Sequence, residues 1–445
     1  MKKLLIAFLL IGFVGVCEAI PTKEKPRVIV MTDGEIDDQS SMIRFLLYTC
    51  DFDVEAIIET NSIFQRKGHS KEDWYEKELN AYQEVYPNLI KHNPDYPTPQ
   101  KLKEYSFLGD EDENHIKDLY WKDMFKVLIP GGNVIYKPDQ WADTPGSDKI
   151  IEILLKDNPA PVYIQAWGGA NTAARAFYKL KTQYPDDYEK AISKVIMYNI
   201  WYQDGAGVYI EHDHPNVTML YSASFKGSWD YNSQKDTYDF IEKYVKNNHG
   251  PLGALYPQDY ISEGDSPSFF YNMVPGLRND ESPTYGGWGG RFVKFKDTPN
   301  TYIDAIEDGD KWLSLRRWID DVNTDYMARM AWCIKSYNEA NHHPVISSKT
   351  PTMITAKPGE EVILNAKKVT DPDKDKISYT WWHYHFAGDN PYHKEIIIDN
   401  KNSKKASIKI PKDALGKDLH IIFSVEDNGV PSLKSYHRLI ISVRK

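Results

Sequence analysis

An apolar strand that ends in an acidic turn is the feature that most constrains what this chain folds into. Residues Arg27–Thr32 form a short run rich in β-branched side chains, which is typical of a buried strand. Four carboxylates follow in the next six residues: Asp33, Glu35, Asp37 and Asp38. Apolar residues then recur at helical spacing. This order of strand, acidic loop and helix predicts the first unit of an α/β domain, in which ligands bind beyond the carboxyl ends of the strands.

The acidic turn has two interpretations. Four carboxylates that are buried together repel one another, at a cost of several kcal/mol. A hard divalent cation with oxygen ligands, such as Ca²⁺, would convert that repulsion into binding energy. A solvated acidic loop, or carboxylates that cap the following helix, would explain the same residues without a metal. The motif alone leaves both interpretations open.

Later strand patterns end in the same way, in polar residues or glycine. Asn61 ends the second pattern, and Gly168-Gly169 ends the third, before an alanine-rich helical segment. The paired glycines allow the backbone to approach another group closely, although a plain tight turn accounts for them as well. The predicted strands after the first lie at residues 54–61, 161–172, 194–201 and 217–222.

A run of acids and imidazoles, Glu211-His212-Asp213-His214, lies between the last two of these strands. We predict a loop here, in which His212 and His214 alternate and therefore face one side of an extended segment. A transition-metal site would need a third ligand, which the sequence does not identify. A polar loop that faces the substrate is the other interpretation.

Two further turns carry chemically active side chains. Asp265 lies in a polar turn before a short helical pattern, and Gly286–Arg291 is a glycine-rich loop that contains Trp288 and Arg291. This loop is interpreted either as a mobile lid with a stacking platform or as a flexible crossing. The helical segment after it, residues 311–341, has an apolar stripe that we assign to the core.

The pattern changes from helical to alternating after residue 343. Five stretches of alternating apolar residues, separated by turn signals such as Asp371–Asp375, predict a small immunoglobulin-like β-sandwich of the kind found in PKD domains. Trp381 and Trp382 face opposite sides of their strand, so at most one of them lies in a core. The stretches are 361–364, 377–382, 406–410, 420–425 and 439–443. We place the domains at 20–343 and 344–445; carbohydrate binding is one role open to the second.

Composition narrows the class of partner. The chain of 445 residues, 41% of them hydrophobic, is long enough for two domains with their own cores. Its net charge of −10 and the lack of a basic stripe exclude a nucleic acid polymer as the expected partner. Aromatic residues make up 13% of the chain, including 12 Trp and 30 Tyr, which suits stacking on sugar rings and equally an aromatic core.

The first 19 residues have the parts of a secretory signal peptide. A basic start is followed by an apolar run, Leu4–Val16, and by a small residue at a cleavage site after Ala19. The run is too short to span a membrane comfortably. Val16 before Cys17 disfavours a lipoprotein, so we expect a secreted or periplasmic protein, with the cell surface also open. Outside the signal only Cys50 and Cys333 remain, either as buried thiols or as one disulfide.

The strand-end residues together resemble the nucleoside hydrolase superfamily. Its opening signature is an aspartate followed four and five residues later by an aspartate pair, which here are Asp33, Asp37 and Asp38. Asn61 and Asp265 match a later strand end and a late aspartate of that family. With the signal peptide and the terminal β domain, the chain resembles secreted bacterial proteins described as cellulose-binding with a nucleoside-hydrolase-like domain. The resemblance implies a mostly parallel sheet with flanking helices, followed by the sandwich.

The resemblance also implies a Ca²⁺ site and a hydrolytic mechanism. Asp33, Asp38, Asp265 and the backbone carbonyl of Asn171 would bind Ca²⁺, and Asp33 would take a proton from the attacking water. Asp37 and Asn61 would bind sugar hydroxyls. Further expected substrate contacts are Glu211, His212, Trp288 and Arg291. Candidates for the acid that protonates the leaving group are Glu35, Glu211, His212, Asp213 and His214.

Two departures from the superfamily change the expected substrate. Gly34-Glu35 replaces a Pro-Gly pair, and Gly264 stands where a histidine assists departure of the nucleobase. We therefore expect hydrolysis of an N- or O-glycosyl bond in a glycan-derived sugar rather than of common nucleosides. The rival class is a carbohydrate-binding protein without turnover, acting on a cellulose-like polysaccharide. A phosphatase with a nucleophilic aspartate is disfavoured because Glu35 stands where its second aspartate belongs. Relatives of the superfamily also leave a homo-oligomer open.

Overall fold

The α/β domain is built on an eight-stranded sheet with the strand order β3-β2-β1-β4-β5-β6-β8-β7. All neighbouring strands are parallel except β7 and β8. The computed structural model describes residues 24–116, 129–227, 235–257, 263–273 and 275–445, so the predicted signal peptide and Cys17 lie outside the described residues. The strands are β1 (Arg27–Thr32), β2 (Asp53–Glu59), β3 (Ser106–Leu108), β4 (Val162–Ala166), β5 (Val195–Ile200), β6 (Thr218–Ser222), β7 (Phe292–Lys294) and β8 (Thr301–Asp304).

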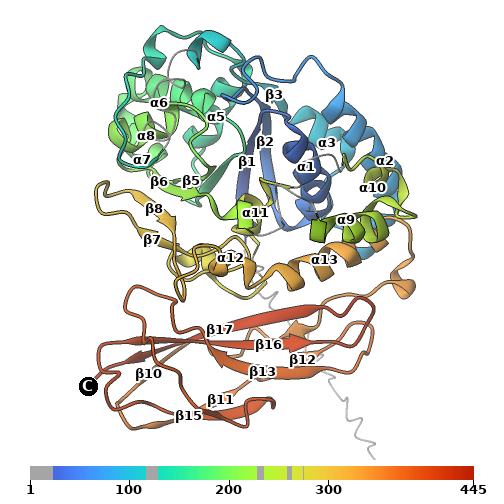
Figure 1. Cartoon of the computed structure of the whole chain (residues 1–445), viewed down its shortest axis with the longest axis vertical. Coiled ribbons are helices and arrows are strands. Elements are labelled where there is room, and N and C mark those ends of the chain that lie inside the picture. The colour runs from blue at the N-terminus through green and yellow to red at the C-terminus, as the bar shows by residue number, and fades with distance from the viewer. Residues whose placement is uncertain (1–23, 117–128, 228–234, 258–262, 274) are drawn as a thin grey trace, which may run out of the picture.

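Helices cover both faces of this sheet because its central strands are apolar on both sides. In β1, Val28 and Val30 face one hydrophobic core, whereas Ile29 and Met31 face the other. The first core includes side chains of α1, α2, α11 and α13, and the second includes side chains of α5 to α8 (Figure 1). The helices are α1 (Ile36–Tyr48), α2 (Trp74–His92), α3 (Pro99–Glu104), α5 (Pro145–Leu155), α6 (Asn171–Gln183), α7 (Pro185–Ile192), α8 (Ala206–Asp213), α9 (Lys235–Ile241), α10 (Gly250–Ala254), α11 (Ser266–Phe270), α12 (Leu313–Arg316) and α13 (Ile319–Trp332).

The strand order places a topological switch point between β1 and β4. From β1 the chain moves outward to β2 and β3, and it then returns to β4 on the other side before moving outward again. In open α/β sheets, ligands bind at the carboxyl ends of the strands beside such a point. The acidic turn that follows β1 therefore lies where this fold forms its binding crevice.

The C-terminal part is the predicted β-sandwich. A sheet of order β10-β17-β16-β13 packs on a sheet of order β11-β15-β14, and the alternating residues of both form a separate core. Trp381 is 1% exposed in this core, whereas its neighbour Trp382 packs against the α/β domain, as their opposite directions predict. The strands are β9 (Val345–Ile346), β10 (Met353–Ala356), β11 (Glu361–Asn365), β12 (Val369–Thr370), β13 (Ser378–His383), β14 (Ile398–Asp399), β15 (Lys405–Lys409), β16 (Asp418–Glu426) and β17 (Lys434–Val443).

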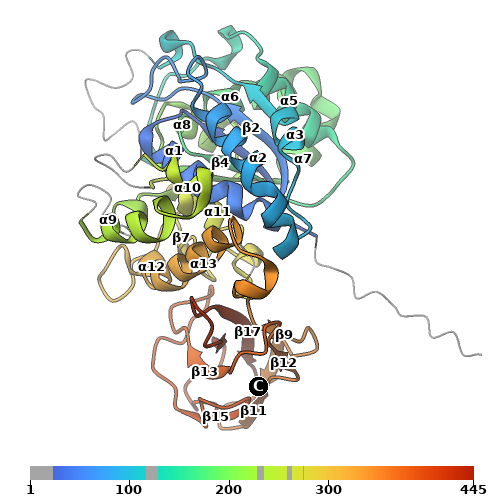
Figure 2. The same cartoon turned by 90° about the vertical axis from the view of Figure 1, so that its right-hand side faces the viewer.

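The junction between the two domains is apolar and well packed. Helices α12 and α13 lie directly against the sandwich (Figures 1 and 2). Trp318 contacts the rings of Trp382, Tyr384 and Tyr436, with centroid distances of 5.9, 6.1 and 5.6 Å. Arg438 of β17 is fully buried and donates to the backbone carbonyls at positions 285 and 286, both at 2.7 Å. The first core of the α/β domain therefore continues into the sandwich, and the two domains share it.

Two smaller questions from the sequence are answered by the fold. Cys50 and Cys333 are free, buried thiols, and burial raises the pKa of both. Cys50 lies beside the guanidinium of Arg329, whose Nη1 is 3.4 Å from the sulfur. Within the described ranges, no helix is both long and apolar enough to cross a membrane.

Candidate functional site

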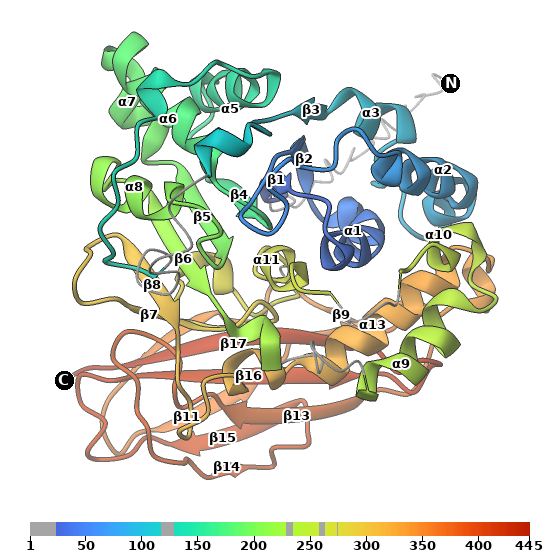
Figure 3. The same ribbon diagram turned by 45° about the horizontal axis from the view of Figure 1, so that its top comes forward.

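The candidate site lies at the switch point, where β1 and β4 end beside α1 and α11. Figure 3 shows these two helices on the same side of the sheet. Four aspartates meet here: Asp33 at the end of β1, Asp37 and Asp38 in the first turn of α1, and Asp265 just before α11. Carboxylate oxygens of the last three lie within 4.8 Å of one another. We call these four residues the buried aspartate cluster.

Hydrogen bonds from neighbouring segments fix the cluster. Oδ1 of Asp38 accepts from the hydroxyl of Thr32 at 2.5 Å and from the backbone N–H of Asp33 at 3.1 Å. The backbone N–H of Asp265 donates to the hydroxyl of Ser41 at 3.1 Å. Thr32 of β1 and Ser41 of α1 therefore hold two aspartates, Asp38 and Asp265, that are more than 200 positions apart in the sequence.

A buried ion pair supports the same contact between α1 and the loop before α11. Arg44 and Glu263 are joined by two contacts of 2.8 Å, and both side chains are 1% exposed. Because both side chains are buried, removing either one would leave the charge of the other buried and uncompensated. Arg44 and Glu263 are thus positioning residues for Asp265, and the sequence analysis did not find them.

Two glycines are required by the close approach of these segments. Gly34 has a φ of +75°, the left-handed conformation that glycine adopts without strain, and this turns the chain from β1 into α1. A Cβ on Gly168, at the end of β4, would lie 2.8 Å from the Cβ of Asp33. The predicted close approach at Gly168 is therefore real, and its partner is the first aspartate of the cluster.

The electrostatics of the cluster favour a bound cation. The four aspartates are 1 to 6% exposed. Among the described residues, Asp33, Asp38 and Asp265 form no ion pair with a lysine or arginine. Burial and the neighbouring carboxylates hold the pKa of Asp38 and of Asp265 well above the usual value, and burial raises the pKa of Asp33. Oδ2 of Asp33 and Oδ2 of Asp265 are buried and have no hydrogen-bond donor among the residues described. An all-oxygen donor set of this kind fits Ca²⁺.

The rim of the cluster is formed by Glu35 and by the loop after β2. Glu35 is half-buried and accepts from the amide of Gln65 at 3.2 Å; burial, followed by the charges of Asp33 and Asp37, raises its pKa to about 8. Phe64, which directly precedes Gln65 in this loop, is 47% exposed. Its ring lies against that of Trp201, with centroids 6.4 Å apart.

Trp201 is held in an unusual conformation at the end of β5. Its φ of 61° is rare for a bulky side chain and marks a position that the surrounding structure holds under strain. The ammonium group of Lys226 lies 4.0 Å from the centroid of its ring. Phe64 and Trp201 form an aromatic rim near the aspartate cluster, which the sequence analysis missed because the two residues are far apart in sequence.

Asn61 and Asn171 lie behind the cluster and are bonded to each other. The amide nitrogen of Asn171 donates to Oδ1 of Asn61 at 2.5 Å, and the amide nitrogen of Asn61 donates to the carbonyl of Arg66 at 2.8 Å. Asn171 is the first residue of α6, so its carbonyl points along the helix and away from the strand ends. This direction does not fit the expected role of the Asn171 carbonyl as a Ca²⁺ ligand. The carboxylate that lies with Asp38 and Asp265 is that of Asp37.

The predicted loop at residues 211–214 is wrong, because residues 211–213 form the end of α8 and His214 is its C-cap. Glu211 is 2% exposed and accepts from Tyr202, from Thr301 and from the backbone N–H of residue 131. His212 is exposed and bonded to the carbonyl of residue 132. His214 is buried between two tyrosines, and burial lowers its pKa to about 3. These side chains support α8 and do not face the cluster.

The glycine-rich loop is neither a lid nor a flexible crossing. Trp288 is 2% exposed and packs edge-on against Phe270 and Tyr436, and Arg291 forms a buried ion pair with Glu307 at 2.7 Å. The loop is fixed because the sandwich covers it. The expected substrate roles of Trp288 and Arg291 do not fit this placement.

Asp204 is a further buried carboxylate that the sequence analysis did not single out. It accepts from the backbone N–H groups of Asn171 and Ala206, both at 2.9 Å, and so caps α6 and α8 together. Burial raises its pKa to about 7. An aspartate-glycine pair directly after a predicted strand was the available signal for such a cap.

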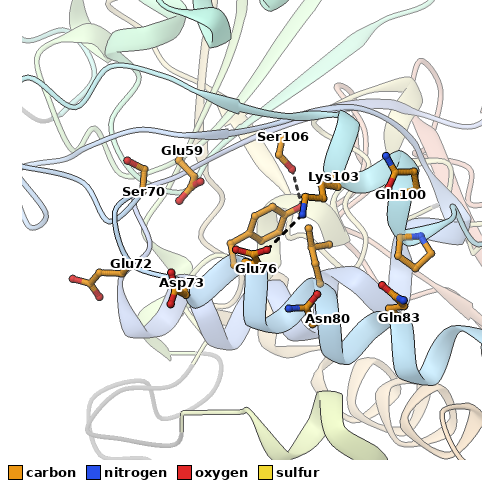
Figure 4. A pocket seen from close by; sticks show the side chains of 13 residues that line it. Glu59, Ser70, Glu72, Asp73, Glu76, Asn80, Gln83, Gln100, Lys103 and Ser106 are labelled. Atoms are coloured by element: carbon orange, nitrogen blue, oxygen red, sulfur yellow. Dashed lines mark hydrogen bonds and ion pairs between the residues drawn. The ribbon is translucent and has the colours of Figure 1, made fainter.

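A polar pocket of about 430 Å³ lies beside the site, between α2, α3 and β3 (Figure 4). Its walls include Glu59, Glu76 and Lys103, and the last two face each other with 3.5 Å between charged atoms. None of the four aspartates lines it. The pocket is therefore separate from the buried aspartate cluster.

The fold and the cluster define a protein of the nucleoside-hydrolase-like class, and comparison with known proteins agrees. Residues 27–292 match the family described as cellulose-binding Sde182, nucleoside hydrolase-like domain, and residues 361–443 match the C-terminal domain of cellulose-binding protein Sde0182. The chain belongs to this cellulose-binding Sde182 family. A search of curated proteins gave no match.

A solved structure of a related protein resembles nearly the whole of this chain. It is a nucleoside hydrolase-related hypothetical protein from Saccharophagus degradans, described as associated with carbohydrate metabolism; it is 32% identical, with a TM-score of 0.80, and the match covers 94% of this chain and 100% of that one. Weaker likenesses are a PKD domain from KIAA 1837 protein (19% identity, 22% of this chain, 87% of that one, TM-score 0.17) and the effector XopQ (8%, 71%, 96%, 0.36).

Proposed function

We propose that this chain is a calcium-dependent hydrolase of a glycosidic bond in carbohydrate, acting outside the cytoplasm. The buried aspartate cluster is the observation that carries the proposal. Buried carboxylates are costly unless a cation or protons compensate them, and within the described ranges Asp33, Asp38 and Asp265 have no lysine or arginine partner. The aromatic rim, the family description and the relative associated with carbohydrate metabolism support a sugar as the substrate.

Asp33, Asp37, Asp38 and Asp265 would hold the Ca²⁺. When bound, Ca²⁺ supplies positive charge that acidifies a water molecule and orients sugar hydroxyls. Asp33 is the base in this proposal, because its Oδ2 is buried and accepts no hydrogen bond from the described residues. Thr32 and Ser41 fix Asp38 and Asp265, so the carboxylates need little rearrangement during the reaction.

In this proposal Glu35 is the acid that protonates the leaving group, because of its position. It borders the cluster, it is half-buried, and Gln65 holds its carboxyl group at the rim. The other candidates, Glu211, His212, Asp213 and His214, lie at the end of α8. Two carboxyl groups that act as base and acid on opposite sides of a glycosidic bond are the usual apparatus for this hydrolysis.

The proposal is tested with Asp33→Asn, which keeps the size of the side chain and one oxygen ligand. We expect turnover to fall by about 10²–10⁴-fold, the usual contribution of a general base, while sugar binding is retained. Cello-oligosaccharides and aryl glycosides should be better substrates than inosine and uridine. The assay compares wild type, Asp33→Asn and the exposed control Asp157→Asn, each with Ca²⁺ and after treatment with a chelator.

A second candidate function is carbohydrate binding without turnover. The exposed ring of Phe64, which lies beside Trp201, favours it, because aromatic faces bind sugar rings without any chemistry at the cluster. This second function replaces the first if two results are obtained together. Wild type hydrolyses neither the glycosides nor the nucleosides, and Asp33→Asn binds cello-oligosaccharides as tightly as wild type does. Rapid hydrolysis of inosine would instead contradict the expected consequence of Gly264.

A further inference from the structure

We propose a second calcium site, in the sandwich at its junction with the α/β domain. The site is formed by Asp371, Asp373, Asp375 and Asp427, which we call the junction aspartates. It is independent of the proposed hydrolase function, because its residues belong to another domain and another core.

The loop between β12 and β13 brings three of these carboxylates to one point. Oδ1 of Asp371 accepts from the backbone N–H groups of Asp373 and Asp375, both at 2.9 Å, and Lys374 between them has a φ of 70°. Carboxylate oxygens of the three aspartates lie within 4.8 Å of one another. A tight acidic loop of this kind occurs without a metal, so the case for a site depends on what faces it.

Asp427 is the buried group that faces the loop. It follows β16, whose pairing with β13 sets Glu426 opposite Ser378, and the backbone N–H of Lys376 donates to the side chain of Asn428 at 2.7 Å. The end of β16 therefore lies directly beside the acidic loop. Asp427 is 4% exposed, and its Oδ2 is buried without a hydrogen-bond donor in the described ranges.

The other carboxylate oxygen of Asp427, Oδ1, accepts three hydrogen bonds, and these fix the direction of Oδ2. Oδ1 accepts from the backbone N–H groups of Gly429 and Leu433 and from the amide of Asn341, at 2.9, 3.1 and 2.9 Å. Burial raises the pKa of Asp427, and the negative charge of Asp371 adds to the rise, as expected for carboxylates that face each other. Oδ2 of Asp371 is likewise buried and without a donor in the part of the chain described.

The protein supplies little positive charge to these four carboxylates. In the described residues their one ion-pair partner is His342, whose Nδ1 lies 3.1 Å from Asp373. The available donor atoms are carboxylate oxygens on a loop that is partly open to water. Ca²⁺ accepts six to eight such oxygens in flexible geometry and takes the remainder from water, whereas Zn²⁺ prefers nitrogen and sulfur ligands.

The position of the site gives the ion a structural consequence. Two neighbouring residues of the connection between the domains contact the site: Asn341 through Asp427, and His342 through Asp373. On its other side, His342 is bonded to His92 of α2 at 3.0 Å. An ion at the junction aspartates would therefore tie the sandwich loops to the connection and, through His342, to the α/β domain.

The test is the number of Ca²⁺ ions that the full chain binds. Each protein is stripped with a chelator and titrated with Ca²⁺ by calorimetry, and its bound Ca²⁺ is measured by mass spectrometry after dialysis. Asp375→Asn is the main variant, because its carboxylate accepts no hydrogen bond from the described residues and the fold should be unaffected. Asp427→Asn is the second variant, since its amide oxygen can still accept at the Oδ1 position. Asp399→Asn, exposed on β14, is the control.

We expect each of the two variants to bind one ion fewer than wild type, or to bind that ion at least tenfold more weakly, while Asp399→Asn is unchanged. The difference of one ion is expected whether or not the buried aspartate cluster binds Ca²⁺, so failure of the proposed function would not hide it. Circular dichroism in the absence of Ca²⁺ verifies that the variants are folded. Equal ion counts and equal affinities in wild type and both folded variants would overturn the proposal.

Discussion

The two aspartate clusters of this protein differ in how they are built. The buried aspartate cluster combines residues from the end of β1 and the start of α1 with Asp265 before α11, which is over 200 positions later in the sequence. Every member is at most 6% exposed. The junction aspartates come from one five-residue turn and one buried partner, and the turn is half-exposed. The first therefore needs the whole domain to exist, whereas the second needs only two adjacent loops.

This difference predicts different energetics. Desolvation makes charge on the first cluster costly, so a cation there changes the stability of the entire α/β domain. Water reaches the loop of the second cluster, although not its buried partner Asp427, and screens part of the repulsion, so a cation there affects mainly the junction. The following predictions test this comparison.

Breaking the ion pair behind the first cluster should have the largest effect. Glu263→Gln leaves the Arg44 guanidinium buried without its countercharge, which typically costs about 3–5 kcal/mol. Chemical denaturation measures the loss, and the exposed pair of Asp157 and Lys190 provides the control: Asp157→Asn should leave the free energy of unfolding almost unchanged, because water screens this pair. If the folded Glu263→Gln protein keeps its full Ca²⁺ count, the ion pair does not position Asp265.

Ca²⁺ should stabilise the domain through the first cluster by a smaller amount. At one hundred times its Kd, a ligand that binds only the folded state adds about 2.7 kcal/mol. Asp38→Ala should remove this rise in Tm, whereas Asp375→Asn should remove a much smaller part of it. Calorimetric melting with and without Ca²⁺ provides the comparison, and a wild-type Tm that ignores Ca²⁺ contradicts the first site.

The smallest change per step of an experiment, at most about 1.4 kcal/mol per pH unit, is expected from Asp204, a buried acid outside both clusters. Its folded-state pKa of about 7 lies above its ordinary value of 3.8, so the folded state binds its proton more tightly. Its contribution to stability is complete below about pH 4 and is lost as the pH rises through 7, by at most about 1.4 kcal/mol per pH unit.

This loss should not depend on Ca²⁺, because Asp204 is bonded to backbone N–H groups of α6 and α8 and belongs to neither cluster. Asp204→Asn should flatten the curve of unfolding free energy against pH between 5 and 7. If Ca²⁺ abolishes the slope in wild type, the slope comes from the clusters and the assignment to Asp204 is wrong.

Local patterns were sufficient to predict the fold class. The strand at residues 27–32, the switch to alternating strands after residue 343 and the opposite directions of Trp381 and Trp382 each depend on side-chain periodicity within a few residues. The acidic turn at Asp33 was found for the same reason. Periodicity does not predict the helix that ends near residues 211–214, because α8 is only eight residues long and its last residues are charged, which is also typical of a loop.

Long-range contacts explain the other differences. Nothing near Gly286–Arg291 in the sequence indicates that Tyr384 and Arg438 cover the loop, because these residues come from strands about 100 to 150 positions later. The pair of Arg44 and Glu263, and the pair of Phe64 and Trp201, were missed for the same reason. In each case one partner alone carries no recognisable pattern.

Arg438 bears on how freely the domains of such proteins can be recombined. Its buried charge is held by the carbonyls of Tyr285 and Gly286 on the other domain, and burial lowers its pKa to about 9. A sandwich transplanted onto a different α/β domain would bring this cation without the carbonyls that accept its hydrogen bonds. The sandwich is therefore not an exchangeable cassette, and in a chimaeric protein the 285–291 loop has to be inherited together with β17.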